Sequence, residues 1–196
     1  EQAIKLDPTN ADYLYHRGML HLESAEFDPA IEHFSDAIAL IENVYGHEIL
    51  RLDTGDSAAA DPRHAKPFSG RARAYVETGV PTQGLADAGR AIEILRGNLN
   101  SPEWSSLEPE IKLQMADAYQ VRGDAYAKRG QSEDADDQYR KSKAMHYSAR
   151  VMTHAKAGDF ESAIDDFNTA IQIDPPPSAY LIDQGVIFDL RSLRSY

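Results

Sequence analysis

Two short motifs in this chain contain residue types that hydrolytic enzymes use. Asp53-Thr54-Gly55 matches the three-residue core of aspartic proteases, but that class holds its aspartate on a β-framework and pairs it with a second one. His47-Glu48 begins like the helix of a zinc protease, although Arg51 stands where the second histidine belongs. Neither motif is complete, and the sequence contains no glycine-rich phosphate loop and no nucleophile elbow. We therefore predict that the chain is not an enzyme and has no catalytic residues.

The sequence also offers no metal ligands at a useful spacing. His16 and His21 are five residues apart, and His146 and His154 are eight apart. The acidic run at 133–137 has no central glycine, which a calcium loop needs for its sharp turn. There is no Cys, which excludes disulfides, thiolate metal sites and a cysteine nucleophile. We expect no metal and no cofactor, and we interpret the acidic run as the solvated face of a helix.

Length and charge narrow the classes of partner. The chain has 196 residues and a formal net charge of −12, which is enough for one ordinary domain or a short repeat array. Phosphate binding needs clustered Lys and Arg, so nucleic acid is a poor partner for such an acidic surface. No run of 18 apolar residues is present, so the sequence predicts no transmembrane helix. It indicates no compartment.

The segment from Gly158 to Pro175 is the most regular part of the sequence. Gly158-Asp159 predicts a turn before a helix, and the prolines after Asp174 end it. Small and large residues share its apolar face, so a neighbouring helix can approach closely at the alanines. The helix cannot bury this face alone and needs partners. The apolar residues recur at spacings of three and four, as on one face of an α-helix: Phe160, Ala163, Ile164, Phe167, Ala170, Ile171 and Ile173.

The same pattern occurs near the start of the chain. Ala30, Phe34 and Ala37 repeat the alanine–phenylalanine–alanine spacing of the later helix, and the distance from Ala3 to Ala37 gives a period of 34 residues. That period is typical of the tetratricopeptide repeat, whose first helix carries a mid-helix glycine, here Gly18. On these residues the chain resembles the tetratricopeptide repeat (TPR) family.

The resemblance implies an all-α fold, an α-α superhelix (solenoid) of stacked antiparallel helix pairs. We predict a single TPR-like domain over 1–196. Its expected parts are a partial repeat at 1–10, repeats at about 11–44, 65–97, 110–144 and 145–177, a final capping or half-repeat helix at 178–196, and insertions at about 45–64 and 98–109.

Three features depart from the family pattern. Gly46 is expected to end the helix that begins near residue 28. In the second unit Gly84 replaces an alanine and Ala88 replaces the aromatic residue, so we expect looser packing there. Gly130 and Gly158 are only 28 residues apart, six short of a period. Either the helices between them have lost a turn, or they run together.

In the family, the first helices of the pairs line a concave surface, which implies a non-catalytic scaffold that binds a protein or a peptide. Exposed aromatic and Met side chains offer adaptable contact area on such a surface. The positions that this arrangement assigns to the groove are Asp12, Tyr15, Met19, Lys66, Arg73, Asp117, Gln120, Asp124 and Met152.

One known use of the family is a basic clamp for the C-terminal carboxylate of chaperone tails. Lys66 fits one of its slots, but the other slots hold Asp12, His16, Gly70, Asp117 and Val121. A carboxylate ligand would therefore meet acid where it needs base. We expect a basic or apolar partner segment instead.

Two alternatives stay open. The chain could self-associate through open repeat ends, since its last segment carries apolar residues at Leu181, Val186, Ile187, Phe188 and Leu190. It could also be the accessory domain of a larger enzyme or signalling protein.

Overall fold

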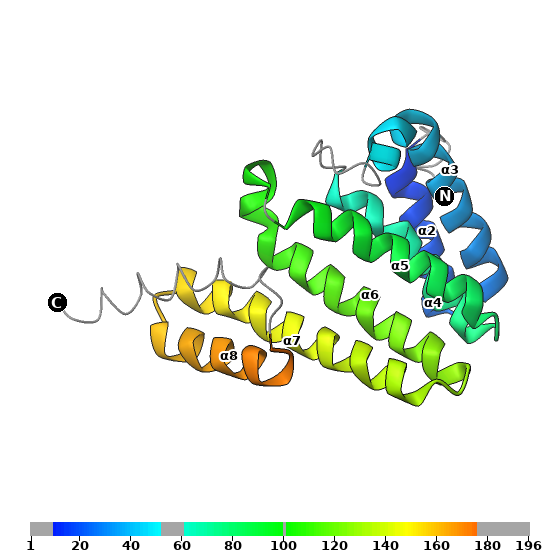
Figure 1. Cartoon of the computed structure of the whole chain (residues 1–196). Coiled ribbons are helices and arrows are strands. Elements are labelled where there is room, and N and C mark those ends of the chain that lie inside the picture. Colours follow the sequence, from blue (N-terminus) through cyan, green and yellow to red (C-terminus); the bar gives the residue numbers. More distant parts are fainter. Residues whose placement is uncertain (1–9, 52–60, 100, 176–196) are drawn as a thin grey trace.

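The computed structural model describes residues 10–51, 61–99 and 101–175. These residues form α-helices and short 3-10 helices, with no strand among them. The predicted all-α fold class is confirmed. Along the chain lie α2 (Ala11–Glu23), α3 (Phe27–Arg51), η2 (Pro62–His64), α4 (Ala65–Glu77), α5 (Pro81–Asn98), η3 (Pro102–Leu107), α6 (Glu108–Lys128), α7 (Ser132–Lys156) and α8 (Phe160–Ile173) (Figure 1).

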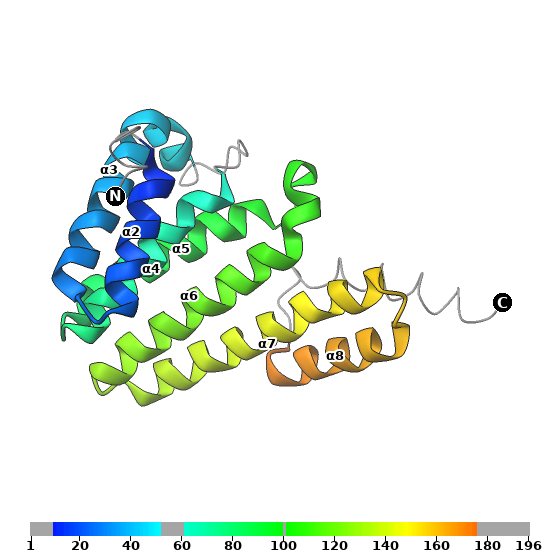
Figure 2. The same ribbon diagram turned by 180° about the vertical axis from the view of Figure 1, so that it is seen from behind.

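Successive helices pack on one another as a superhelical repeat requires. α2 pairs with α3, α4 with α5 and α6 with α7, and α8 packs on α7. The first helices also touch, because α4 contacts both α2 and α6. Figure 2 shows the resulting row of helices from α2 to α8 from behind. Each pair buries its apolar face against the next pair, which is how a solenoid builds a continuous core.

Tight left-handed turns close the hairpins. Gly79, Gly130 and Gly158 adopt φ values of 77°, 74° and 78°, a region that glycine enters without a steric cost. The residue after each glycine donates its backbone N–H to a carbonyl five positions earlier. The first hairpin makes the same turn with Ala25 at φ 58°. These turns fix where each first helix stops and its partner begins.

An aromatic ring fills a notch made by glycines between neighbouring helices. Phe34 on α3 is 0% exposed, and a methyl group added to Gly18 or to Gly70 would lie 2.6 Å from its ring. Tyr139 fills a similar notch at Gly123, where an added methyl group would lie 2.4 Å from the tyrosine ring. The helices can approach this closely only because the facing backbone carries no side chain.

The second pair is tightly packed at the positions where we expected looseness. A methyl group on Gly84 would lie 3.0 Å from the carbonyl oxygen of Ala72. Ala72 and Ala88 are both 0% exposed and belong to one apolar cluster with Val76. The expectation of looser packing is therefore wrong at Gly84 and Ala88, because the small residues draw the two backbones together instead of leaving a gap.

Two helix limits differ from the sequence-based expectation. α3 continues through Gly46 to Arg51, so its expected end at Gly46 is wrong. α7 is one continuous helix of 25 residues, so the helices before and after residue 144 run together. The first half of α7 pairs with α6 and its second half pairs with α8 (Figure 1). The expected partial repeat at 1–10 lies outside the described residues except for Asn10. The expected final helix at 178–196 and the Asp53-Thr54-Gly55 motif lie outside them entirely.

Polar contacts at one fixed separation join the two helices of several pairs. In each, an arginine on the first helix contacts a residue sixteen positions later on the second. The contacts are Arg71–Asp87 at 2.7 Å, Arg122–Gln138 at 2.8 Å and Arg150–Asp166 at 3.1 Å. The first pair carries Arg17 and His33 at the corresponding positions. Two like-signed groups therefore face each other there once His33 is protonated.

The first prediction concerns the glycine notch. Gly18→Ala should lower the free energy of unfolding by about 1–3 kcal/mol, because overpacking against an enclosed ring forces the helices apart. Chemical denaturation followed by circular dichroism measures the change. Gly89→Ala is the matched control: no atom lies within 4 Å of its added methyl group, so it should stabilise the protein by about 0.5–1 kcal/mol. An unchanged stability for Gly18→Ala would contradict the enclosure of Phe34.

The second prediction concerns the pH dependence of stability. Burial, followed by the charges of Arg17 and His21, lowers the pKa of His33 from its ordinary 6.5, while Glu32 and Asp36 act in the opposite sense. The unfolded chain then binds a proton that the folded chain resists, so the free energy of unfolding should fall as the pH drops below about 6.5. Denaturation midpoints measured across this range report the slope.

Two variants test the assignment of this slope to one residue. His33→Gln introduces the residue type that Arg122 contacts in the third pair, and it should flatten the slope below about pH 6.5. His146→Gln, at an exposed position of α7, should leave the slope as it is. The same slope in wild type and in His33→Gln would sink the prediction.

Candidate interaction groove

The first helices of three pairs enclose a small hollow. Its volume is about 120 Å³, and it lies where α2, α4 and α6 come together. The side chains that line it are Tyr15, Met19 and Leu22 from α2, Lys66, Ser69, Gly70 and Arg73 from α4, and Gln114 and Asp117 from α6. We call these nine residues the α2/α4/α6 hollow. Segments that are about a hundred residues apart in the chain thus share one surface.

Five of the nine predicted groove residues line this hollow: Tyr15, Met19, Lys66, Arg73 and Asp117. The helix pairing therefore brings together residues that the repeat pattern placed on one face. Asp12, Gln120, Asp124 and Met152 do not line it. Whether any of these residues contacts a partner stays a prediction.

The four outlying residues have identifiable positions. Asp12 is exposed in the first turn of α2, where its backbone N–H donates to Asn10. Asp124 accepts hydrogen bonds from the Tyr139 hydroxyl at 2.9 Å and from Gln120 at 3.3 Å, so it is engaged with α7. Met152 is half-buried on the second half of α7. Gln120 and Asp124 lie nearer the carboxyl end of α6 than the hollow does.

Four lining residues were missed by sequence reasoning as groove positions. Leu22, Ser69 and Gln114 each lie three residues from a residue that was predicted, namely Met19, Lys66 and Asp117. Residues three apart on a helix share a face, so this spacing was the available signal. Gly70 lines the hollow through its backbone, because the ring of Phe34 occupies the space of a side chain.

Aromatic packing supports the hollow from beneath. The rings of Tyr15 and Phe34 are 6.0 Å apart. Tyr15, Met19 and Leu22 pack against the buried cluster formed by Ala30, Phe34 and Ala74. The apolar wall on α2 is therefore held in place by the same ring that sets the distance between α2 and α4.

The two basic side chains of the hollow, Lys66 and Arg73, are available for contact with a ligand. Lys66 and Arg73 make no ion pair with the described part of the chain. The side-chain oxygen of Gln114 is buried and has no hydrogen-bond partner there, and such a group costs free energy until it meets a donor. Burial raises the pKa of Tyr15, while Arg73 lowers it and Asp117 raises it. Arg73 and Asp117 therefore both act on the phenol at the centre of the hollow.

A model of the tetratricopeptide repeat family matches residues 147–177. That range covers the second half of α7 together with α8, which pack as a helix pair. Residues 147–177 form a tetratricopeptide repeat. The matched TPR unit begins in the middle of α7, so its first helix is fused to the second helix of the unit before it. A comparison with curated proteins gave no match.

The described part of the chain shows neither a metal site nor a membrane span. Within it, no three His, Asp or Glu side chains gather in a way that could hold a metal ion. None of its helices has the length and the apolar character needed to cross a membrane.

The third prediction tests the geometry of the hollow without a ligand. Arg73→Ala should raise the pKa of Tyr15 further, because Arg73 lowers it in the wild type. Asp117→Asn should lower that pKa, since the Asp117 carboxylate disfavours the tyrosinate. The chain has ten Tyr, so the titration is followed by NMR with ring-labelled tyrosine and assigned through Tyr15→Phe. Opposite shifts would show that Arg73 and Asp117 do not face Tyr15.

Proposed function

We propose that this protein is a non-catalytic TPR scaffold that binds an extended segment of a partner protein in the α2/α4/α6 hollow. The observation that carries the proposal is a pair of unpaired cations, Lys66 and Arg73, beside an apolar wall on α2. Charged and apolar groups in one concavity are what fix the register of a bound peptide. The tetratricopeptide repeat at residues 147–177 supports the same role, since this repeat is common in interaction modules.

The local charge of the hollow favours an acidic contact. Lys66 and Arg73 face a single acid, Asp117, whereas the whole chain carries −12. An acidic side chain of the partner would meet two cations there, and it would be repelled by most of the surrounding surface. This proposal revises our expectation of a basic or apolar segment, which rested on the net charge of the chain.

The apolar wall on α2 favours an apolar partner side chain next to the acidic one. Met19, Leu22 and Tyr15 are all half-buried and pack against the same apolar cluster. A partner side chain such as Leu or Met fits beside them, because Met and aromatic surfaces adapt to apolar shapes. The proposed ligand is therefore an extended segment with an acidic and an apolar side chain close together.

The fourth prediction concerns binding by this hollow. A library of random peptides displayed on phage is selected on the intact chain, and enriched peptides are measured by fluorescence anisotropy. We expect acidic–apolar peptides, with Arg73→Glu weakening binding about tenfold or more since it places like charges together. Met19→Ala should weaken binding less, through lost contact area.

The control for this experiment is Arg129→Glu, which makes the same charge change at an exposed position beyond the end of α6. It should bind the selected peptides as the wild type does. Enrichment of basic peptides, or equal affinity of wild type and Arg73→Glu, would contradict the proposal. Tyr15→Phe reports separately on the phenol, because it keeps the ring in place.

A further inference from the structure

α7 begins with about three turns that α8 does not cover. α8 packs only on its second half, through Val151 and Ala155 of α7 and Phe167 of α8. In a regular array the first half would meet the next first helix, but here that helix is the continuation of α7 itself (Figure 1). The fusion of two helices therefore leaves one face of α7 without a neighbour in the described chain.

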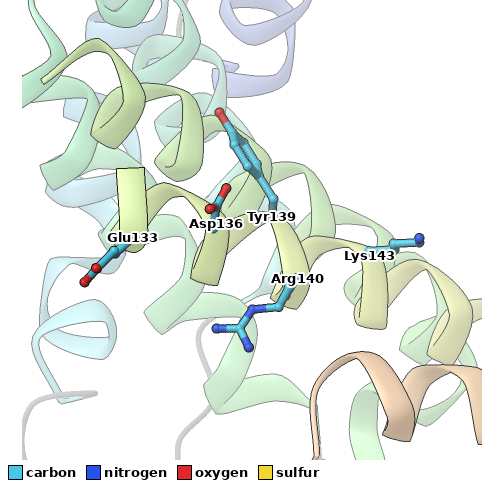
Figure 3. Close-up of a pocket in the computed structure, with 5 residues that line it drawn as sticks. All are labelled: Glu133, Asp136, Tyr139, Arg140 and Lys143. Atoms are coloured by element: carbon cyan, nitrogen blue, oxygen red, sulfur yellow. The ribbon is translucent and has the colours of Figure 1, made fainter. Parts of the chain in front are cut away.

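Charged side chains occupy that face. Glu133, Asp136, Arg140 and Lys143 are exposed and follow one another at spacings of three and four, which places them on one side of the helix. With Tyr139 they line a shallow hollow of about 620 Å³ (Figure 3). The two acids come first along the helix and the two bases follow.

The order of these charges is symmetric about residue 138. Glu133 and Lys143 each lie five residues from it, and Asp136 and Arg140 each lie two residues from it. If a second α7 is laid antiparallel across the first with its midpoint at 138, Glu133 of one copy faces Lys143 of the other. Asp136 faces Arg140 in the same way, and each contact occurs twice, as a two-fold interface requires.

We propose that the first half of α7 is a self-association surface whose partner is a second copy of this chain. The two helices cross antiparallel over the face formed by Glu133, Asp136, Arg140 and Lys143. Tyr139, one residue from the midpoint, lies near the two-fold axis, with its hydroxyl held by Asp124 at 2.9 Å. This surface is separate from the α2/α4/α6 hollow, and the proposal stands without the proposed function.

The charges on this face are free to make such contacts. Glu133, Asp136 and Lys143 form no ion pair within the described part of the chain. Arg140 contacts Asp137 at 3.3 Å, but its side chain is 60% exposed and a guanidinium has further N–H donors. A uniformly acidic or basic partner would satisfy only half of the face, whereas a second copy satisfies all of it.

The association should be weak and sensitive to salt. Exposed ion pairs contribute little individually and are screened at high ionic strength. Sedimentation velocity of the intact chain, over a range of concentrations, should show a monomer–dimer equilibrium at low salt. Raising the salt concentration should shift that equilibrium toward monomer.

Charge reversal gives a decisive test of the pairing. Glu133→Lys alone should abolish the dimer, because it sets a lysine against Lys143 at both contacts, and Lys143→Glu alone should do the same with two glutamates. When the two variants are mixed, both contacts regain opposite charges. The mixed pair should then associate about tenfold or more tightly than either variant with itself, since two repulsive contacts become attractive.

Glu161→Lys and Lys156→Glu are the matched controls, because they make the same charge changes at exposed positions outside this face. Each should dimerise as the wild type does, and their mixture should show no gain. If the wild type stays monomeric at every concentration, the face does not bind a second copy of the chain, and the proposal is overturned. A dimer that is insensitive to salt, or a mixture of Glu133→Lys and Lys143→Glu that does not associate, would overturn it too.

Discussion

The close approach of helices at glycine is the constraint on which the rest of this structure depends. Phe34 fills the notch between Gly18 on α2 and Gly70 on α4, where even one added methyl group would lie 2.6 Å from the ring. The ring thereby sets how far apart these two first helices stand. It also packs beneath Tyr15, so the wall of the α2/α4/α6 hollow depends on the contact that joins the first two helix pairs. Stability and the shape of the candidate site are thus linked through one side chain.

Residues with a local signature were the ones that the sequence could predict. Phe34 and its flanking alanines lie at helical spacings that a single helix displays, so the fold class followed from them. The continuity of α7 could not be predicted, because a shortfall of six residues suits either a lost turn or a fused helix. At Gly84 we predicted loose packing, and the structure shows tight packing instead. A small residue can leave a gap or let the facing backbone come closer, and the position of the neighbouring helix determines which of the two occurs.

In the candidate site, too, the sequence predicted the features with a local signature and missed those that depend on how two helices meet. Five lining residues followed from the repeat pattern, because the pattern fixes which face of each first helix is concave. The charge of the hollow did not, since it depends on the register in which Lys66 and Arg73 on α4 meet Asp117 on α6. Net charge was a poor guide for this reason: a hollow of a few side chains can carry the opposite sign to the chain. The arginine contacts between paired helices were equally hard to predict, because their partner is an aspartate in two pairs and a glutamine in another.

The fused helix changes what a scaffold of this kind can do. A regular array grows by adding pairs to its end, whereas the continuous α7 leaves, among the described residues, one face without a neighbouring helix. The charges on that face complement those of a second copy. If two copies join there, each keeps its own α2/α4/α6 hollow on different helices from the interface. A partner with two suitable segments would then bind the second hollow at a high effective concentration, and its overall affinity would exceed that of either segment alone. Weak self-association through α7 is sufficient for this effect, because a partner that bridges the two hollows stabilises the dimer by the same coupling free energy.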